Sequence, residues 1–126
     1  MKKIIALSAS FAALVLAPAA ASAHHSFAMF DVAKTATVEG VVRSFEWTNP
    51  HSWINVAVLD ASGQASDWRI EGQSPNELER RGWRRLTLQP GDKVLLVVHP
   101  RRDGMAGGMM VSASVNGTKI GVTPAG

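Results

Sequence analysis

The fold is decided by the stretch TVEGVVRSFEW at residues 37–47. Val38, Gly40 and Val42 alternate along one face of a β-strand, whereas Phe45 and Trp47 have the opposite phase. A slip of phase beside a glycine is typical of a bend or a β-bulge. The stretch therefore predicts a first strand that changes direction part-way along its length.

Downstream of this strand, β-branched and aromatic residues alternate with polar ones between short turn signals. The alternating stretches lie at residues 53–59, 66–71, 93–99, 109–115 and 118–122. Asn49-Pro50 and Asn116-Gly117 are strong turn signals, and the second is typical of a two-residue hairpin. The pattern predicts a small sheet that ends in a hairpin.

A short helix is predicted between the third and fourth strands. Ser74 is a good N-cap, Pro75 suits the first helical position, Glu77 completes a capping box, and Gly82 provides a stop. We therefore expect a mainly β fold: an OB-like five-stranded barrel with one short helix between strands three and four and a C-terminal β-hairpin arm. A β-sandwich or another small barrel would give nearly the same pattern.

The first 23 residues have the pattern of a cleaved signal peptide. Lys2 and Lys3 precede an uncharged apolar run at residues 4–17, and small residues stand at Ala21 and Ala23. The alternative is an uncleaved anchor, but the run is shorter than the ~20 residues that a membrane-spanning helix needs. We expect cleavage after Ala23, and a mature protein without a membrane span in the periplasm or medium.

Cleavage would leave 103 of the 126 residues, enough for one small domain. We expect an N-terminal arm at 24–36, the barrel at 37–122 and a tail at 123–126. Two of the 13 basic residues lie in the signal, so the mature chain, with 11 basic and 10 acidic residues, has a net charge of only +1. Cysteine is absent, which excludes disulfides and thiolate sites.

Several motifs resemble those of a known family. They are His24-His25-Ser26-Phe27, the segment FEWTNPH at 45–51, the segment SPNEL at 74–78, Gly82-Trp83 and Pro90-Gly91-Asp92. Together they look like a family of small exported proteobacterial proteins of unknown function. The resemblance implies export and a single domain, and it implies no activity.

The histidine pair at the expected new terminus has the chemistry of a metal chelate. A terminal His24 would offer its α-amine and an imidazole nitrogen to one ion, and His25 adds a second chelating arrangement. Nitrogen-rich sites of this type favour Cu(II). The alternative is a pair of polar residues on a frayed terminus.

Two further histidines are candidate ligands. His51 follows the first strand and is the preferred third ligand, because this loop borders the usual ligand surface of an OB-fold. Its alternative role is a hydrogen bond that fixes the Asn49-Pro50 turn. His99, at the end of the fourth strand, is a weaker candidate and fits a surface or edge position equally well.

Methionines give a soft-ligand pattern after His99. Met105 and Met109 carry thioethers that favour Cu(I), although methionine also fills irregular cores. Met29 and Phe30 are expected to pin the N-terminal arm to the barrel, which would bring His24 near a loop.

A metal-free interaction surface is the competing hypothesis. Its residues are aromatic and basic: Trp47, Trp53, Trp83, Arg84 and Arg85. On an exported protein these would recognise an envelope protein or another envelope component rather than nucleic acid. A solvated helix end is the simpler explanation of the arginines, and docking of the helix is the simpler role of Trp83.

Hydrolytic motifs are missing from the sequence. It has no Gly-x-Ser-x-Gly elbow, no His-Glu-x-x-His and no phosphate loop. We therefore expect a binding protein rather than an enzyme, with a copper-dependent oxidase as a third hypothesis. Oligomeric state is left open by the sequence.

Overall fold

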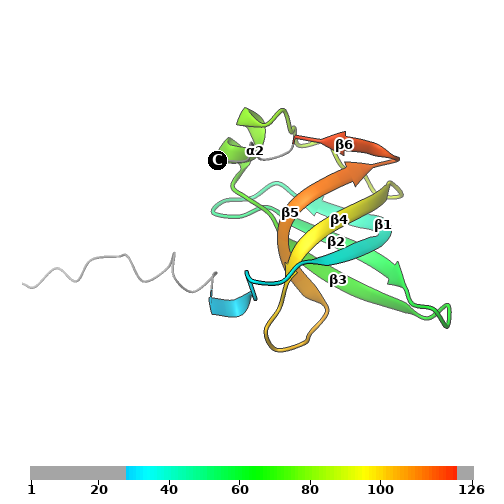
Figure 1. The fold of residues 1–126 in the computed structure, drawn as a ribbon. Coiled ribbons are helices and arrows are strands. Elements are labelled where there is room, and N and C mark those ends of the chain that lie inside the picture. Colours follow the sequence, from blue (N-terminus) through cyan, green and yellow to red (C-terminus); the bar gives the residue numbers. More distant parts are fainter. Residues whose placement is uncertain (1–27, 122–126) are drawn as a thin grey trace, which may run out of the picture.

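The computed structural model describes residues 28–121. The expected signal peptide, the His24-His25 pair and the expected tail lie outside these residues. The elements along the described chain are β1 (Ala36–Glu46), β2 (Trp53–Leu59), β3 (Ala65–Glu71), α2 (Pro75–Arg80), β4 (Lys93–Pro100), β5 (Gly107–Val115) and β6 (Thr118–Ile120) (Figure 1).

The predicted bend in β1 is confirmed as a β-bulge. Val42 pairs with Val56 of β2, but the next pair joins Ser44 to Asn55, so Arg43 is an extra residue. The extra residue restores the phase, and Phe45 packs against the same core as Val42. Gly40 assists the bend, because a Cβ there would lie 2.3 Å from the Ala57 carbonyl oxygen.

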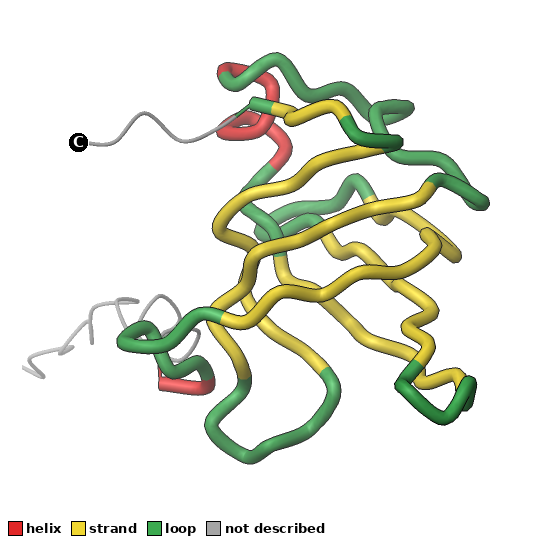
Figure 2. Tube along the Cα trace, turned by 45° about the vertical axis from the view of Figure 1, so that its right-hand side comes forward, coloured by secondary structure: helices red, strands yellow, loops and turns green. Residues whose placement is uncertain are grey.

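The sheet closes into a barrel of OB type. The strand order is β3-β2-β1-β4-β5-β6, and an additional parallel pairing joins β3 to β5 (Figure 2). Strands β1 to β5 therefore form the closed five-stranded barrel that the sequence predicts. Asn116 and Gly117, at φ 47° and 84°, make the expected hairpin turn, and β6 extends the sheet beside β5.

Strand β5, which closes the barrel by pairing with β3, begins earlier than the sequence predicts. Gly107 and Gly108, expected in a loop, already belong to β5 and pair with Arg69 of β3 and Pro100 of β4. A Cβ on Gly108 would lie 2.8 Å from the His99 carbonyl oxygen. The two glycines are therefore needed where three strands converge, and they do not signal a loop.

Helix α2 covers one end of the barrel. The Ser74 hydroxyl accepts from the Glu77 amide, Pro75 begins the helix, and Gly82 at φ 86° follows its end, as predicted. Leu78 of the helix and Trp83 just beyond it are fully buried in the core. The Trp83 ring lies 6.0 Å from that of Phe45, so the helix end is docked on the bent part of β1.

Candidate metal site at the N-terminal arm and the β4–β5 loop

His99 lies near the end of β4 and is held in one tautomer. Its Nδ1 atom is 2.7 Å from the Lys34 carbonyl oxygen. A carbonyl oxygen only accepts hydrogen bonds, so Nδ1 carries the hydrogen and donates it. The lone pair is then on Nε2. Metal-binding histidines are commonly oriented by a hydrogen bond of this kind from the other ring nitrogen.

His51, in the β1–β2 loop, is held in a similar way. Its Nδ1 atom is 3.3 Å from the Gly72 carbonyl oxygen and also 3.3 Å from Oε1 of Glu71. The His51 side chain is 40% exposed, whereas that of Glu71 is 6% exposed. The ring therefore binds the end of β3 through Nδ1, which leaves Nε2 without a hydrogen bond to another of residues 28–121, as in His99.

A row of paired residues across three strands separates the two histidines, with His99 at one end and Glu71, the neighbour of His51, at the other. In the sheet register, Glu71 of β3 pairs with Met109 of β5, and Met109 pairs with His99 of β4. Neighbouring strands lie about 4.8 Å apart, so the backbones of Glu71 and His99 are about 10 Å apart. Met109 is between them. Within residues 28–121, no three His, Cys, Asp or Glu side chains are grouped to hold a metal ion.

The N-terminal arm is anchored beside His99. Phe30 is 2% exposed and forms a β-bridge with Arg101. The Asp31 amide donates to the Pro100 carbonyl at 2.8 Å, and the Arg102 amide donates to the Met29 carbonyl at 2.9 Å. Phe30 thus pins the arm as expected, but at the end of β4. The sequence favoured His51 as the third ligand, whereas the anchor lies next to His99.

Met105 is presented by the β4–β5 loop, which an ion pair holds in shape. The Arg101 guanidinium binds Asp103, whose Oδ1 also accepts from the Met105 amide at 3.0 Å. The hydrogen bond from Arg101 lowers the pKa of Asp103 to about 2, assisted by that amide. Met105 is 65% exposed on this loop. Its thioether is therefore available on the side of the barrel that carries the arm.

The predicted Trp/Arg surface is not assembled as expected. Trp83 is 1% exposed, so placing it on a partner-binding surface was wrong, and its alternative role of docking the helix is the one observed. The Arg84 guanidinium donates to the Trp83 carbonyl at 2.7 Å and to the Glu79 carbonyl, in the last turn of α2, at 3.4 Å. Arg85 is exposed. Trp47 packs against the core and the Phe45 ring, with their centroids 5.6 Å apart.

A polar network that the sequence did not predict surrounds Trp53 on the outer face of β2 and β3. The Arg69 guanidinium lies 4.4 Å above the Trp53 ring. It also donates to both carboxylate oxygens of Glu46, at 2.9 and 3.2 Å, and to Asn55 at 3.2 Å. The hydrogen bonds from Arg69 and then Asn55 lower the pKa of Glu46. The alternation of Arg69 with Trp68 and Ile70 predicted this face, but not the cross-strand partners.

The comparisons with known proteins identify the family. Residues 12–112 match the model of DUF6152, described as a family of unknown function. The chain belongs to this family. No curated protein matches the chain. Among solved structures, the mitochondrial single-stranded DNA-binding protein Rim1 of S. cerevisiae is similar, with a TM-score of 0.49 and 13% identity, over 70% of this chain and 97% of that one.

The OB-like architecture of this DUF6152 protein follows from its own strand pairing. Over residues 28–121, none of the helical segments is long and apolar enough to span a membrane.

Proposed function

We propose that the protein is exported by a cleaved signal peptide and that its mature barrel binds copper through His24, the new N-terminal residue. His25 is the second ligand residue at the terminus. His99 is the principal ligand from the barrel. Met105 and Met109 supply thioethers when the ion is Cu(I), the form that soft sulfur ligands favour.

The observation that carries this proposal is the anchor of the arm. The hydrogen bond from Asp31 to Pro100 and the buried Phe30 hold the chain a few residues after His25 beside the end of β4. Four residue steps separate His24 from Ala28, a span of at most about 14 Å. The bridge to Arg101 is antiparallel, so in the proposed site the chain before Ala28 turns back over this distance to bring His24 to His99.

The state of the His99 ring supports the same site. A neutral imidazole with Nδ1 bonded to the Lys34 carbonyl has its Nε2 lone pair free and little freedom to rotate. An α-amine and an imidazole from His24 add two nitrogens, and a third from His99 gives the nitrogen-rich set that Cu(II) favours. This set of ligands contains no cysteine, so it is compatible with a sequence that has none.

The test is a calorimetric Cu(II) titration of two forms of the protein. One is the mature chain that begins at His24, and the other is the same chain with its α-amine acetylated. Acetylation removes the amine nitrogen from the chelates of both His24 and His25, so we expect at least about a hundredfold weaker binding. Equal affinity of the two forms would contradict terminal chelation.

A metal-free interaction module is the second candidate, and the stacked pair of Arg69 and Trp53 favours it. Both side chains lie on the outer face of β2 and β3, the face that OB-folds commonly use for ligands. An envelope partner bound there should be lost from pull-downs with Trp53→Ala and retained with Arg85→Ala. Unchanged recovery with Trp53→Ala would exclude this face.

A further inference from the structure

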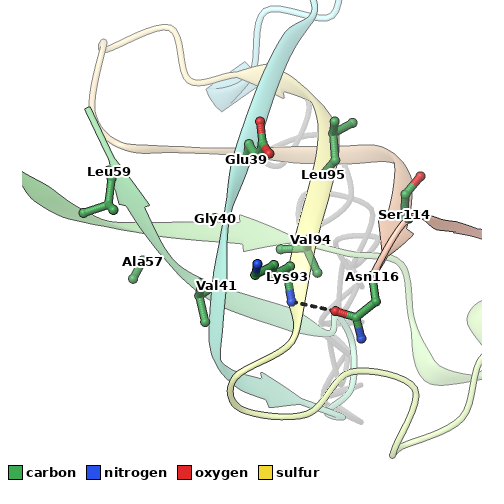
Figure 3. A pocket seen from close by; sticks show the side chains of 11 residues that line it. Glu39, Gly40, Val41, Ala57, Leu59, Lys93, Val94, Leu95, Ser114 and Asn116 are labelled. Carbon is green, nitrogen blue, oxygen red and sulfur yellow. Dashed lines mark hydrogen bonds between the residues drawn. The ribbon is translucent and has the colours of Figure 1, made fainter. Parts of the chain in front are cut away.

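A second outer face, across β1 and β4, is apolar and carries one acid and one base (Figure 3). Val41 is 40% exposed and Leu95 is 42% exposed. In the register, Glu39 of β1 lies beside Leu95 of β4, and Val41 lies beside Lys93. These four side chains form a two-by-two grid, with the apolar residues on one diagonal and the charges on the other.

The two charged groups of the grid have no ionic partner among residues 28–121. The ion pairs of these residues join other groups, and neither the Glu39 carboxylate nor the Lys93 ammonium is bonded to a described side chain. Diagonal neighbours on adjacent antiparallel strands are about 7–8 Å apart, within reach of long side chains, yet the Glu39 carboxylate and the Lys93 ammonium do not form an ion pair in the structure. Both charges therefore remain available to another molecule.

We infer that the occupant of this face is a second copy of the chain, packed about a two-fold axis that runs along the diagonal from Leu95 to Val41. This axis places Leu95 on the partner's Leu95 and Val41 on the partner's Val41. The same rotation exchanges the positions of the two charged residues, so that Glu39 meets the partner's Lys93 and Lys93 meets the partner's Glu39. The face is thus self-complementary, as a two-fold interface must be.

The strand geometry agrees with this packing. With strands about 4.8 Å apart and side chains on one face about 6.8 Å apart along a strand, the diagonal lies roughly 35° from the strands. A two-fold axis along it makes the strands of the two copies cross at about 70°. Sheets that pack face to face cross at about 30° or about 90°, and this crossing is closer to the second class.

The size of the face predicts a weak dimer. Leu59, which is strongly exposed, and Ala57 border the grid on β2, and Ser114 borders it on β5. A patch of four short strand segments buries on the order of 400 Å² per copy, half of what a standard interface buries. We expect a dissociation constant between about 0.1 and 1 mM.

The test is sedimentation equilibrium of the protein expressed from its full sequence, from about 10 µM to about 1 mM. Glu39→Lys alone places two lysines together across the interface and should raise the dissociation constant about tenfold, and Lys93→Glu alone should do the same. The double variant restores opposite charges and should recover the original value within about threefold. Leu95→Glu should abolish association.

The control is Leu86→Glu, which changes a more exposed leucine outside the grid, 72% exposed against 42% for Leu95, and should leave association unchanged. A monomer at every concentration would overturn the inference and would assign the face to a partner of another kind. A double variant as weak as the single variants would overturn the Glu39–Lys93 exchange. Association weakened as much by Leu86→Glu as by Leu95→Glu would also contradict the inferred dimer.

Discussion

His51 and His99 have similar hydrogen bonds at Nδ1 but lie in different parts of the fold. Each ring has Nδ1 against a backbone carbonyl and Nε2 free. His51, however, lies beside the buried carboxylate of Glu71, in a loop between β1 and β2. His99 lies beside the anchored arm. Under the copper-binding function proposed above, both rings are oriented to bind an ion, and the anchored arm is the feature that favours His99.

Removing the anchor should have the largest effect on this comparison. Phe30→Ala deletes a buried ring and should cost about 3 kcal/mol of unfolding free energy, measured by urea denaturation. It should also release the arm, so that the Cu(II) affinities of His51→Ala and His99→Ala become equal in the Phe30→Ala background.

The control for this variant is Leu86→Ala, at an exposed position, which should change stability by less than about 0.5 kcal/mol. If His99→Ala still weakened copper more than His51→Ala without the Phe30 ring, the anchor would not be what selects His99.

Replacing each histidine in the intact protein should have the next largest effect. His99→Ala removes one nitrogen ligand and should weaken Cu(II) binding about tenfold to thirtyfold, whereas His51→Ala should change it less than about threefold. Competition with a chromophoric chelator measures both. The reverse order would make the β1–β2 loop the source of the third ligand, as the sequence favoured.

Replacing an exposed methionine should weaken Cu(I) binding without changing Cu(II) binding. Met105→Leu keeps the volume of an exposed side chain and removes its sulfur, so Cu(I) binding should weaken about threefold to tenfold while Cu(II) binding stays unchanged. Met110→Leu, in the core, is the control and should affect neither. Equal losses for both ions would show that Met105 acts through the shape of the loop.

Breaking the ion pair between Arg101 and Asp103 should have the smallest effect, confined to the β4–β5 loop beside His99. Its pKa is lowered to about 2 by Arg101, so the ion pair contributes fully above the ordinary pKa of about 4 and is lost as the pH falls towards 2. A carboxyl NMR titration should show this midpoint, and Arg101→Gln should raise it by more than about one unit. An unchanged midpoint in Arg101→Gln would exclude the ion pair as its cause.

Much of the fold was predictable because its signals are local. The phase slip after Gly40 predicted the bulge, and Ser74, Pro75 and Glu77 predicted a helix that begins at Pro75. Gly107 and Gly108 misled the prediction, because a glycine needed for close strand packing has the same sequence signal as a glycine in a loop.

The candidate site was less predictable because its contacts are not local. Histidines and methionines identify the chemistry by residue type, but the bridge between Phe30 and Arg101 joins distant segments and leaves no periodic pattern. The sequence therefore predicted that Phe30 pins the arm near a loop but did not identify which loop. For the same reason the sequence could not decide whether Trp83 is buried, since a tryptophan on the surface and one that docks a helix give the same local pattern.

The most direct test of the central claim observes the histidine ring nitrogens by ¹H–¹⁵N NMR in the mature chain, before and after loading with diamagnetic Cu(I). The account predicts that Nε2 of His99 and a ring nitrogen of His24 shift together at one equivalent of Cu(I), while both nitrogens of His51 keep their positions. An unchanged His99 ring in the loaded protein would contradict the account.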